Sequence, residues 1–321
     1  MKNILKRTKN CFFWLFVILS AIPVYSDNFI PLPSRTPTFN HPFLSQWGGS
    51  GPAKGQLWNP YGIAIDQSEK VYVADYANDR IEVFNSTGSY LTDWGNKGKG
   101  DQEFHHALGV AVDRKGNIYA ADTLNNCIKK YSCDGVYLAQ WGIYGKGEGQ
   151  LFNPSMLAVN AQGNLWVVDC SNNRIQEFTP DGTFITQTGA FGSGQGQFDT
   201  PMGIAVDLAD NFYVSDMNNS RIEKFGPSGN YISQWGKKGS GNSEFDTPEG
   251  ITTDSQDNVY VVDSLNNRIQ EFTSAGTYIT QWGTTGKGNG QFSMPAGIAI
   301  DKDENVYITD WGSDRIEKFG P

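Results

Sequence analysis

The chain has 321 residues, of which 38% are hydrophobic, 13% aromatic and 18% charged, and 37 are glycine. This composition is too aromatic for a disordered chain, and it suits many short strands joined by glycine turns. The formal net charge of −9 argues against nucleic acid as a partner, because such binding needs a basic surface to neutralise phosphates.

The N-terminal segment differs in composition from the rest of the chain. Four basic residues in the first nine precede an apolar run from Cys11 to Val24. This pattern predicts a secretory signal peptide over residues 1–26, or a membrane anchor if the segment stays uncleaved. Both outcomes place the remainder outside the cytoplasm, whether secreted, periplasmic or on the cell surface. Residues 27–42 contain four prolines and predict an extended linker.

From Phe43 to Pro321 the chain repeats itself every 47 residues without insertion or deletion. A fixed period in this range indicates a repeat architecture, and six copies leave no room for a second domain. The same spacing separates five tryptophans, with Thr188 in the slot of the missing one. The aspartates that mark the six copies are Asp75, Asp122, Asp169, Asp216, Asp263 and Asp310.

Within one copy, four short segments have the β-branched and aromatic composition of strands. In the first copy they cover residues 62–66, 71–75, 80–84 and 90–94, and turn residues separate them. Four antiparallel strands in each of six copies predict an all-β, six-bladed β-propeller.

The two ends of the repeated region predict how the ring closes. The last copy stops at Pro321, after its third strand, while Phe43–Trp47 at the other end matches a fourth strand. We therefore expect the N-terminal strand to complete the last blade, which removes two exposed strand edges.

Charged and amide residues recur around the second hairpin of each copy. Asp75 and Arg80 face each other across this hairpin, and opposite charges on paired strands are mildly favourable. In the second copy Cys127 takes the place of the arginine, which predicts that Asp122 lacks a partner. Asn78 and its equivalents lie in the loop, where asparagine tolerates left-handed geometry and bonds its own backbone.

These motifs resemble a known repeat. The string Asp-x-x-Asn-x-Arg-Ile-x-x-Phe, at 169–178 and 263–272, and the glycine-rich lead-in at 194–205 are similar to the NHL repeat. The resemblance covers residues 43–321 and implies a six-bladed propeller. Members of this family bind proteins, bind RNA, serve as extracellular sensor domains or, in a peptide-amidating lyase, carry metal-dependent catalysis. The resemblance therefore implies a fold but no single activity.

Metal ligands are scarce. The lyase-type members place metal-binding histidines around the central channel, whereas His41, His105 and His106 are the only histidines here and are expected in exposed loops. Most aspartates precede tight turns and predict turn roles. We expect no cofactor, although calcium stays open at the carboxylate-rich segment 301–305.

Three cysteines follow the signal segment. Cys127 and Cys170 belong to neighbouring copies, so a disulfide between them would join two blades. The alternative is that Cys127, Cys133 and Cys170 are all free thiols.

The positions that differ between copies are the candidates for a function specific to this protein, because the shared positions build the scaffold. The first and last copies, neighbours once the ring closes, carry aromatic residues in the loops of one face, and aromatic side chains are enriched at binding hot spots. We expect an exported, monomeric module that binds a protein or a glycan there. The candidate binding residues are Trp58, Tyr61, Tyr76, Met202, Glu249 and Trp311.

The alternative is an enzyme. A metal-dependent lyase or lactonase-like hydrolase would have its site in the central channel, drawing on Glu249, Asn160 and the pair His105 and His106.

Overall fold

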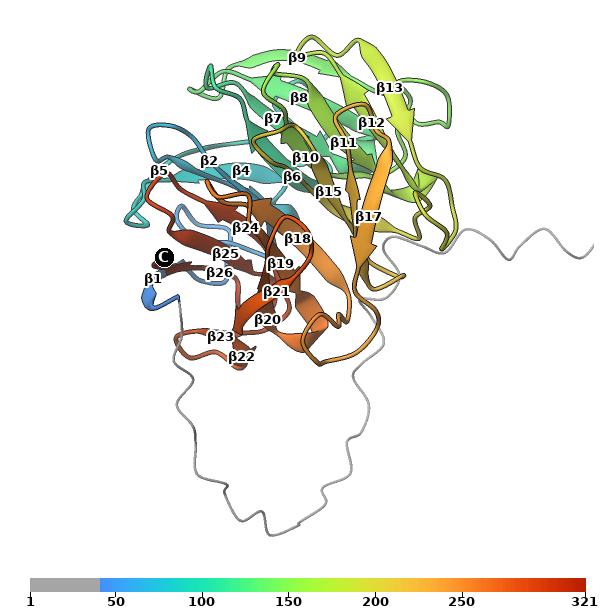
Figure 1. The fold of residues 1–321 in the computed structure, drawn as a ribbon. Helices are drawn as coiled ribbons and strands as arrows, with labels where there is room; N and C mark the ends of the chain where they lie inside the picture. The colour runs from blue at the N-terminus through green and yellow to red at the C-terminus, as the bar shows by residue number, and fades with distance from the viewer. Residues whose placement is uncertain (1–40) are drawn as a thin grey trace, which may run out of the picture.

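The computed structural model describes residues 41–321, which form six four-stranded antiparallel sheets. The sheets follow one another as the blades of a ring (Figure 1). The predicted six-bladed propeller is confirmed. The predicted signal peptide at 1–26 and linker residues 27–40 lie outside the described residues. Between residues 41 and 321, no helix is long and apolar enough to cross a membrane.

Each of the first five blades is built from four consecutive strands, the first of which contacts the first strands of the neighbouring blades. These inner strands are β2 (Pro60–Ile65), β6 (Ala107–Val112), β10 (Pro154–Val159), β14 (Pro201–Val206), β18 (Pro248–Thr253) and, in the last blade, β24 (Pro295–Ile300). The second strands are β3 (Val71–Asp75), β7 (Ile118–Asp122), β11 (Leu165–Asp169), β15 (Phe212–Asp216), β19 (Val259–Asp263) and β25 (Val306–Asp310).

The outer half of each blade consists of the third and fourth strands. The third strands are β4 (Arg80–Phe84), β8 (Cys127–Tyr131), β12 (Arg174–Phe178), β16 (Arg221–Phe225), β20 (Arg268–Phe272) and β26 (Arg315–Phe319). The fourth strands are β5 (Tyr90–Trp94), β9 (Tyr137–Trp141), β13 (Phe184–Thr188), β17 (Tyr231–Trp235), β21 (Tyr278–Trp282) and β1 (Phe43–Gly48).

Short elements connect these strands. β22 (Thr284–Thr285) and β23 (Gln291–Phe292) pair in the connector before the last blade. Three-residue 3-10 helices, which the sequence did not predict, occupy the second hairpins as η1 (Tyr76–Asn78), η2 (Thr123–Asn125), η3 (Cys170–Asn172), η4 (Ser264–Asn266) and η5 (Trp311–Ser313).

The strand predictions for the first copy are close to the observed elements. The second, third and fourth strands coincide with the predicted segments, whereas β2 begins two residues earlier, at Pro60, across a bulge between Pro60 and Ile63. The left-handed residue of the hairpin is Asp79 rather than Asn78. Asn78 instead donates to Asp75 and to the Gly51 carbonyl of the connector.

Glycines allow the inner strands to approach one another closely. A Cβ at Gly62 of β2 would lie within 3.0 Å of the Leu108 backbone on β6, and a Cβ at Gly297 of β24 would meet the Tyr61 carbonyl on β2 in the same way. Five of the six copies have this glycine, and Met156 takes the place in the third. The contact between Gly297 and Tyr61 joins the last blade to the first, so the inner ring is closed.

The recurring Asp–Arg pair fastens the connector between blades. Arg174 Nε donates to Asp169 Oδ2 at 2.7 Å, and Arg174 Nη2 donates to the carbonyls of Gly147 and Gln150, each at 2.8 Å. Both side chains are buried. The pair therefore links the hairpin of one blade to the connector that enters it.

The second blade keeps this link with a different residue, so the prediction that Asp122 lacks a partner is wrong. Lys129, two positions after Cys127, places Nζ 3.0 Å from Asp122 Oδ2. The same Nζ donates to the carbonyls of Gly100 and Glu103, which correspond to those of Gly147 and Gln150. The loss of the arginine at 127 is therefore compensated by a lysine at 129.

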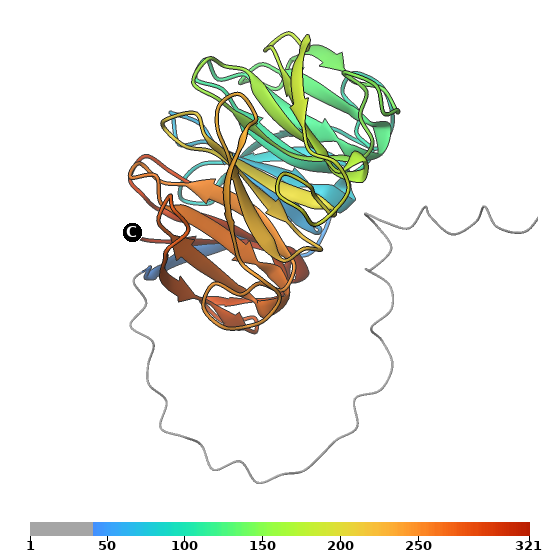
Figure 2. The same cartoon turned by 45° about the vertical axis from the view of Figure 1, so that its right-hand side comes forward.

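The N-terminal strand closes the ring as predicted. β1 pairs antiparallel with β26, and Figures 1 and 2 both show it in blue beside the red C-terminal strands. The Gly320 amide also donates to the Pro42 carbonyl at 2.8 Å. The ordered propeller thus extends at least to His41, two residues beyond the predicted boundary.

His41 is buried, so the expectation of an exposed loop residue is wrong. Its ring lies 4.2 Å from the ring of Trp282, and its nitrogens contact the Gly320 carbonyl and Glu271 Oε2. In other blades the equivalent tryptophan packs on a turn glycine of the next blade, as Trp235 does on Gly276. His41 covers Trp282 because the chain ends stand where that turn would be.

We expect Lys129→Ala to lower the free energy of unfolding by about 3–5 kcal/mol, since it leaves the Asp122 carboxylate buried and unpaired. The double variant Cys127→Arg with Lys129→Gln, which copies the third and fifth blades, should recover stability to within about 1 kcal/mol of the parent. Denaturant unfolding measures both, with exposed Lys115→Ala as the control. A Lys129→Ala variant as stable as the parent would contradict the compensation.

We expect His41→Ala to cost about 1–3 kcal/mol, because it removes buried hydrogen bonds and uncovers Trp282. Leu44→Ala, at an exposed position of β1, is the matched control and should change stability by less than about 0.5 kcal/mol. Thermal unfolding of both variants is the measurement. Equal midpoints would show that the segment before β1 does not contribute to closure.

Candidate functional site

The channel inside the ring has two different ends. The inner strands begin at one end, where the connectors and the 3-10 hairpins also lie, and we call this end the loop face. They finish at the other end, in the turns that begin at Asp66 and its equivalents, and we call this end the turn face. A six-residue strand spans about 20 Å, which separates the two faces.

Side chains fill the channel at the loop face. Tyr61, Leu108, Met156, Met202 and Ala296 come from five different blades and belong to a single buried apolar cluster. Tyr61 of the first blade bonds to Glu249 of the fifth and interacts with Cys170 of the third, so its side chain reaches into the middle of the ring. The channel is therefore plugged at this end.

The remaining blade, the fifth in chain order, contributes a carboxyl group at this level. Glu249 Oε2 accepts a hydrogen bond of 2.7 Å from the Tyr61 hydroxyl. Burial raises the pKa of Glu249 to about 7, although hydrogen bonds from Tyr61 and Ser264 oppose the rise. Burial and the nearby Glu249 also raise the pKa of Tyr61. The plug thus holds a carboxyl group that titrates near neutral pH.

The structure brings five of the six predicted binding residues together. Tyr61 and Met202 belong to the plug, Glu249 bonds to it, and Tyr76 and Trp311 pack against it. Trp58 stands apart, and its side chain is 49% exposed. The expected exposed aromatic group is therefore not formed around Tyr61, whose ring turns into the channel.

Other apolar side chains, which are not among the predicted binding residues, are exposed on the loop face. Ile143, Tyr144 and Phe191 in the connectors are 65%, 67% and 70% exposed. The rings of Tyr144 and Phe152 lie 5.0 Å apart, and Phe191 lines a shallow pocket of about 200 Å³ with residues 171–174. Comparison of the connectors would have found them, because the slot of Tyr144 and Phe191 holds lysine in two other copies.

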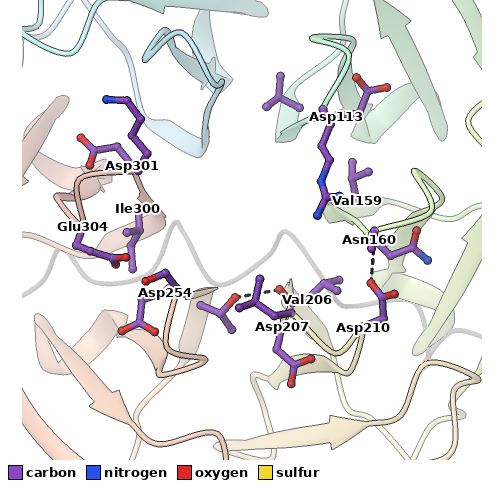
Figure 3. Close-up of a pocket in the computed structure, with 17 residues that line it drawn as sticks. Asp113, Val159, Asn160, Val206, Asp207, Asp210, Asp254, Ile300, Asp301 and Glu304 are labelled. Carbon is purple, nitrogen blue, oxygen red and sulfur yellow. Dashed lines mark hydrogen bonds between the residues drawn. The ribbon is translucent and has the colours of Figure 1, made fainter.

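At the turn face the channel opens into a cavity of about 490 Å³. Figure 3 shows labelled residues from five blades arranged around its open centre. The wall comes from the last residues of the inner strands, which are Val112, Val159, Val206, Thr253 and Ile300.

Aspartates next to this wall hold the turns. Asp113 Oδ1 accepts the backbone amides of Lys115 and Asn117, and Oδ2 accepts the Tyr119 hydroxyl. Asp301 repeats the pattern, so the predicted turn role is observed. Burial raises the pKa of both carboxyls, but the hydrogen bonds outweigh it and the net pKa is lowered. They are therefore ionised at neutral pH.

The residues named for an enzymatic site are not brought together. Glu249 lies at the loop face, whereas Asn160 lines the cavity at the turn face. His106 stacks on Tyr76 with ring centroids 4.4 Å apart and contacts the Tyr76 carbonyl. Within residues 41–321, no group of three or more His, Cys, Asp or Glu side chains could hold a metal ion. These residues do not fit a catalytic metal, and calcium at 301–305 stays a prediction.

The three cysteines between residues 41 and 321 form no disulfide. Cys127 Sγ lies 3.9 Å from Asp122 Oδ2, and Cys170 Sγ lies 3.8 Å from Met202 Sδ. Cys127 thus faces its own hairpin and Cys170 faces the plug, so the disulfide between them is not formed. Cys133 is exposed.

Comparison with protein families supports the geometry. A family described as a 6-bladed beta-propeller matches residues 58–141, 207–272 and 252–320, together more than half of the chain. The chain belongs to this family of six-bladed propellers. The NHL repeat matches residues 153–178, which confirms the resemblance seen in the sequence.

Curated relatives match only short segments of this propeller. E3 ubiquitin-protein ligase TRIM71 of Rattus norvegicus is 41% identical over 49 residues, which are 15% of this chain and 6% of that protein. Protein lin-41 of Caenorhabditis elegans is 39% identical over 44 residues, or 14% and 4%. The chain thus spans a small fraction of the length of these relatives.

Solved structures are similar over most of the propeller. A streptogramin B lyase structure has a TM-score of 0.61 at 18% identity and covers 88% of each chain. A gluconolactonase of Xanthomonas campestris has a TM-score of 0.63 at 15% identity and covers 83% of this chain and 87% of its own. A Bacteroides thetaiotaomicron protein of unknown function reaches 0.66 at 20% identity, with 85% and 72% covered. At these identities the likeness concerns the fold alone.

The raised pKa of Glu249 gives a testable pH dependence. Because its folded pKa is raised from 4.5 to about 7, its contribution to stability is present below pH 4.5 and is lost as the pH rises toward 7. Glu249→Gln stays neutral, so at pH 8 it should be more stable than the parent by about 1–2 kcal/mol. Near pH 4.5 the variant and the parent should have the same free energy of unfolding, which denaturant unfolding measures. The control, Glu148→Gln at an exposed position, should not gain stability between pH 4.5 and pH 8. An equal gain in both variants would refute the assignment of the pH dependence to Glu249.

Proposed function

We propose that this propeller is an exported binding module that takes a protein or glycan partner on its loop face. The observation that carries the proposal is the combination of a plugged channel with exposed apolar side chains above it. Trp58, Ile143, Tyr144, Phe191 and Leu265 are each 49% exposed or more and all lie in the loops of this face. Exposed apolar groups of this kind suit contact with a macromolecule.

The scaffold residues support the same conclusion. The recurring aspartates and arginines are buried and hold connectors and turns, with Lys129 in place of the arginine in the second blade. What remains variable is the set of side chains on the loops. Variation on a fixed frame suits recognition, in which the loops determine the partner.

The second candidate is a hydrolase or lyase of the lactonase-like kind. It is favoured by the Glu249 carboxyl, whose pKa near 7 is of the kind found at functional sites, and by the likeness of the fold to a streptogramin B lyase and a gluconolactonase. We rank it second because Glu249 lies inside the plug and no set of metal ligands within residues 41–321 adjoins it. Metal analysis of the dialysed native protein decides, since a stoichiometric bound ion would favour the enzyme.

The proposal is tested with loop-face variants. Immobilised protein is incubated with the extracytoplasmic fraction of its source organism and, separately, with a glycan array. We expect Tyr144→Ser with Phe191→Ser to reduce retention of the captured partner at least tenfold, since truncation of aromatic anchors costs about 2 kcal/mol or more. The control, Leu138→Ser with Ile185→Ser, removes apolar side chains that are also exposed, by 49% and 42%, but lie on the outer wall, and it should retain the partner.

A second pair of variants locates the contact on the ring. Trp58→Ala with Trp311→Ala alters the first and last blades. Loss of retention in this pair alone would place the partner over the closure, and loss in the connector pair alone would place it over the third and fourth blades. Full retention in both pairs would overturn the loop face as the contact surface.

A further inference from the structure

The cavity at the turn face is separate from the surface proposed above. Its volume of about 490 Å³ lies within the range of small-ligand sites, which measure about 300–1,000 Å³. Four of its five wall positions are apolar, because Val112, Val159, Val206 and Ile300 end their strands with branched aliphatic side chains. A wall of this kind can accept the apolar part of a small molecule.

The rim of the cavity is the part that differs between copies. The wall position is aliphatic or threonine in all six copies, and the next residue is aspartate in five, with Asn160 in the third. The residue that follows the aspartate or asparagine differs in charge and polarity from copy to copy. It is Gln67, Arg114, Ala161, Leu208, Ser255 and Lys302 in chain order. The frame does not dictate these side chains, so the rim is free to determine a ligand.

The charges around the cavity are mostly negative. Six carboxylates line it, against two cationic residues, Arg114 and Lys302. Lys302 is paired with Glu69 and Asp303, so its charge is already balanced. The carboxylates are those of Asp113, Asp207, Asp210, Asp254, Asp301 and Glu304. A cleft lined by one sign of charge attracts ligands of the opposite sign.

Two charged side chains of the lining are available to a ligand. The Glu304 carboxylate has no hydrogen-bond or ion-pair partner among residues 41–321, and Figure 3 shows it beside Ile300, toward the opening. Asp210, by contrast, accepts the Ala161 amide and the Gln162 side chain. Arg114 is also unpaired within the described chain, and its positive charge repels a cationic ligand. Glu304 is therefore the anion best placed to meet one.

We propose that this cavity binds a small organic cation, a primary amine or guanidinium on a short apolar body. The apolar part packs on Val159, Val206 and Ile300, and the cationic end lies against Glu304. The site opens on the opposite face from the macromolecular contact surface. Its existence does not depend on that contact.

Three probes of equal length test the charge requirement. n-Hexylamine, hexanol and hexanoate are titrated into the native protein by calorimetry at neutral pH and low salt. We expect hexylamine to bind at least tenfold more tightly than hexanol and hexanoate not to bind, with hexylamine affinity falling as salt is added. Equal binding of the amine and the alcohol, or no binding of the amine at millimolar concentration, would overturn the proposal.

Two variants with opposite expected effects test the assigned residues. Glu304→Gln should weaken hexylamine binding about three- to tenfold, and Arg114→Gln should tighten it about threefold, because it removes an opposing charge. Gln67 occupies the slot of Arg114 in the first copy, so the frame accepts glutamine there. Tightening in Arg114→Gln also excludes a zwitterion, which would use the arginine and bind more weakly.

Matched controls change the same charges outside the cavity. Asp134→Asn removes an exposed carboxylate from another turn of the same face, and Lys115→Gln removes the exposed cation next to Arg114. Both should bind hexylamine as the parent does. If Asp134→Asn weakens binding as much as Glu304→Gln, the attraction is a general property of an acidic protein and the cavity site is refuted.

Discussion

The close approach of the six inner strands is the constraint on which the rest of the structure depends. In five of the six copies, Gly62 and its equivalents let the inner strand lie against the backbone of the next, and Gly297 makes this contact with Tyr61. A side chain at these positions would meet main-chain atoms, which cannot move aside without opening the ring. This contact makes the central channel narrow, and the blades diverge from it toward their outer strands. Bridging hydroxyls reinforce it, since Thr309 Oγ1 donates to the Tyr61 carbonyl at 2.6 Å.

Where one copy departs from the repeat, a second residue restores the missing interaction. Lys129 replaces the absent arginine of the second blade from a position two residues along the strand. In the third blade Thr188 takes the tryptophan slot, and buried Trp166, which replaces a tyrosine, lies near the glycine turn that the tryptophan would cover. His41 does the same at the closure. These cases show that the copies are constrained by the space between blades more than by the identity of each residue.

The repeat spacing was sufficient to predict the fold. The fixed period gave the number of blades, the β-branched and aromatic composition of four segments gave the strands, and the incomplete last copy gave the closure by β1. The compensating contacts could not be predicted in this way, because Lys129 and His41 act on residues that only the folded ring brings near. The candidate site was predicted in part. Tyr61 and Glu249 share a slot, which placed them at one level of the channel, but the hydrogen bond between them forms only in the folded ring.

Side-chain length explains why the two ends of the channel differ although the backbone ring is the same. At the loop face the inner-strand slot carries Tyr61, Leu108, Met202 and Glu249, which are long enough to meet in the middle. At the turn face the corresponding slot carries valine, isoleucine or threonine in every copy, and branched short side chains line the wall without reaching across it. The channel is therefore a cavity closed at one end rather than a pore. A ligand that enters from the turn face cannot reach the loop face, so contact with a macromolecule and capture of a small cation can evolve independently on one frame.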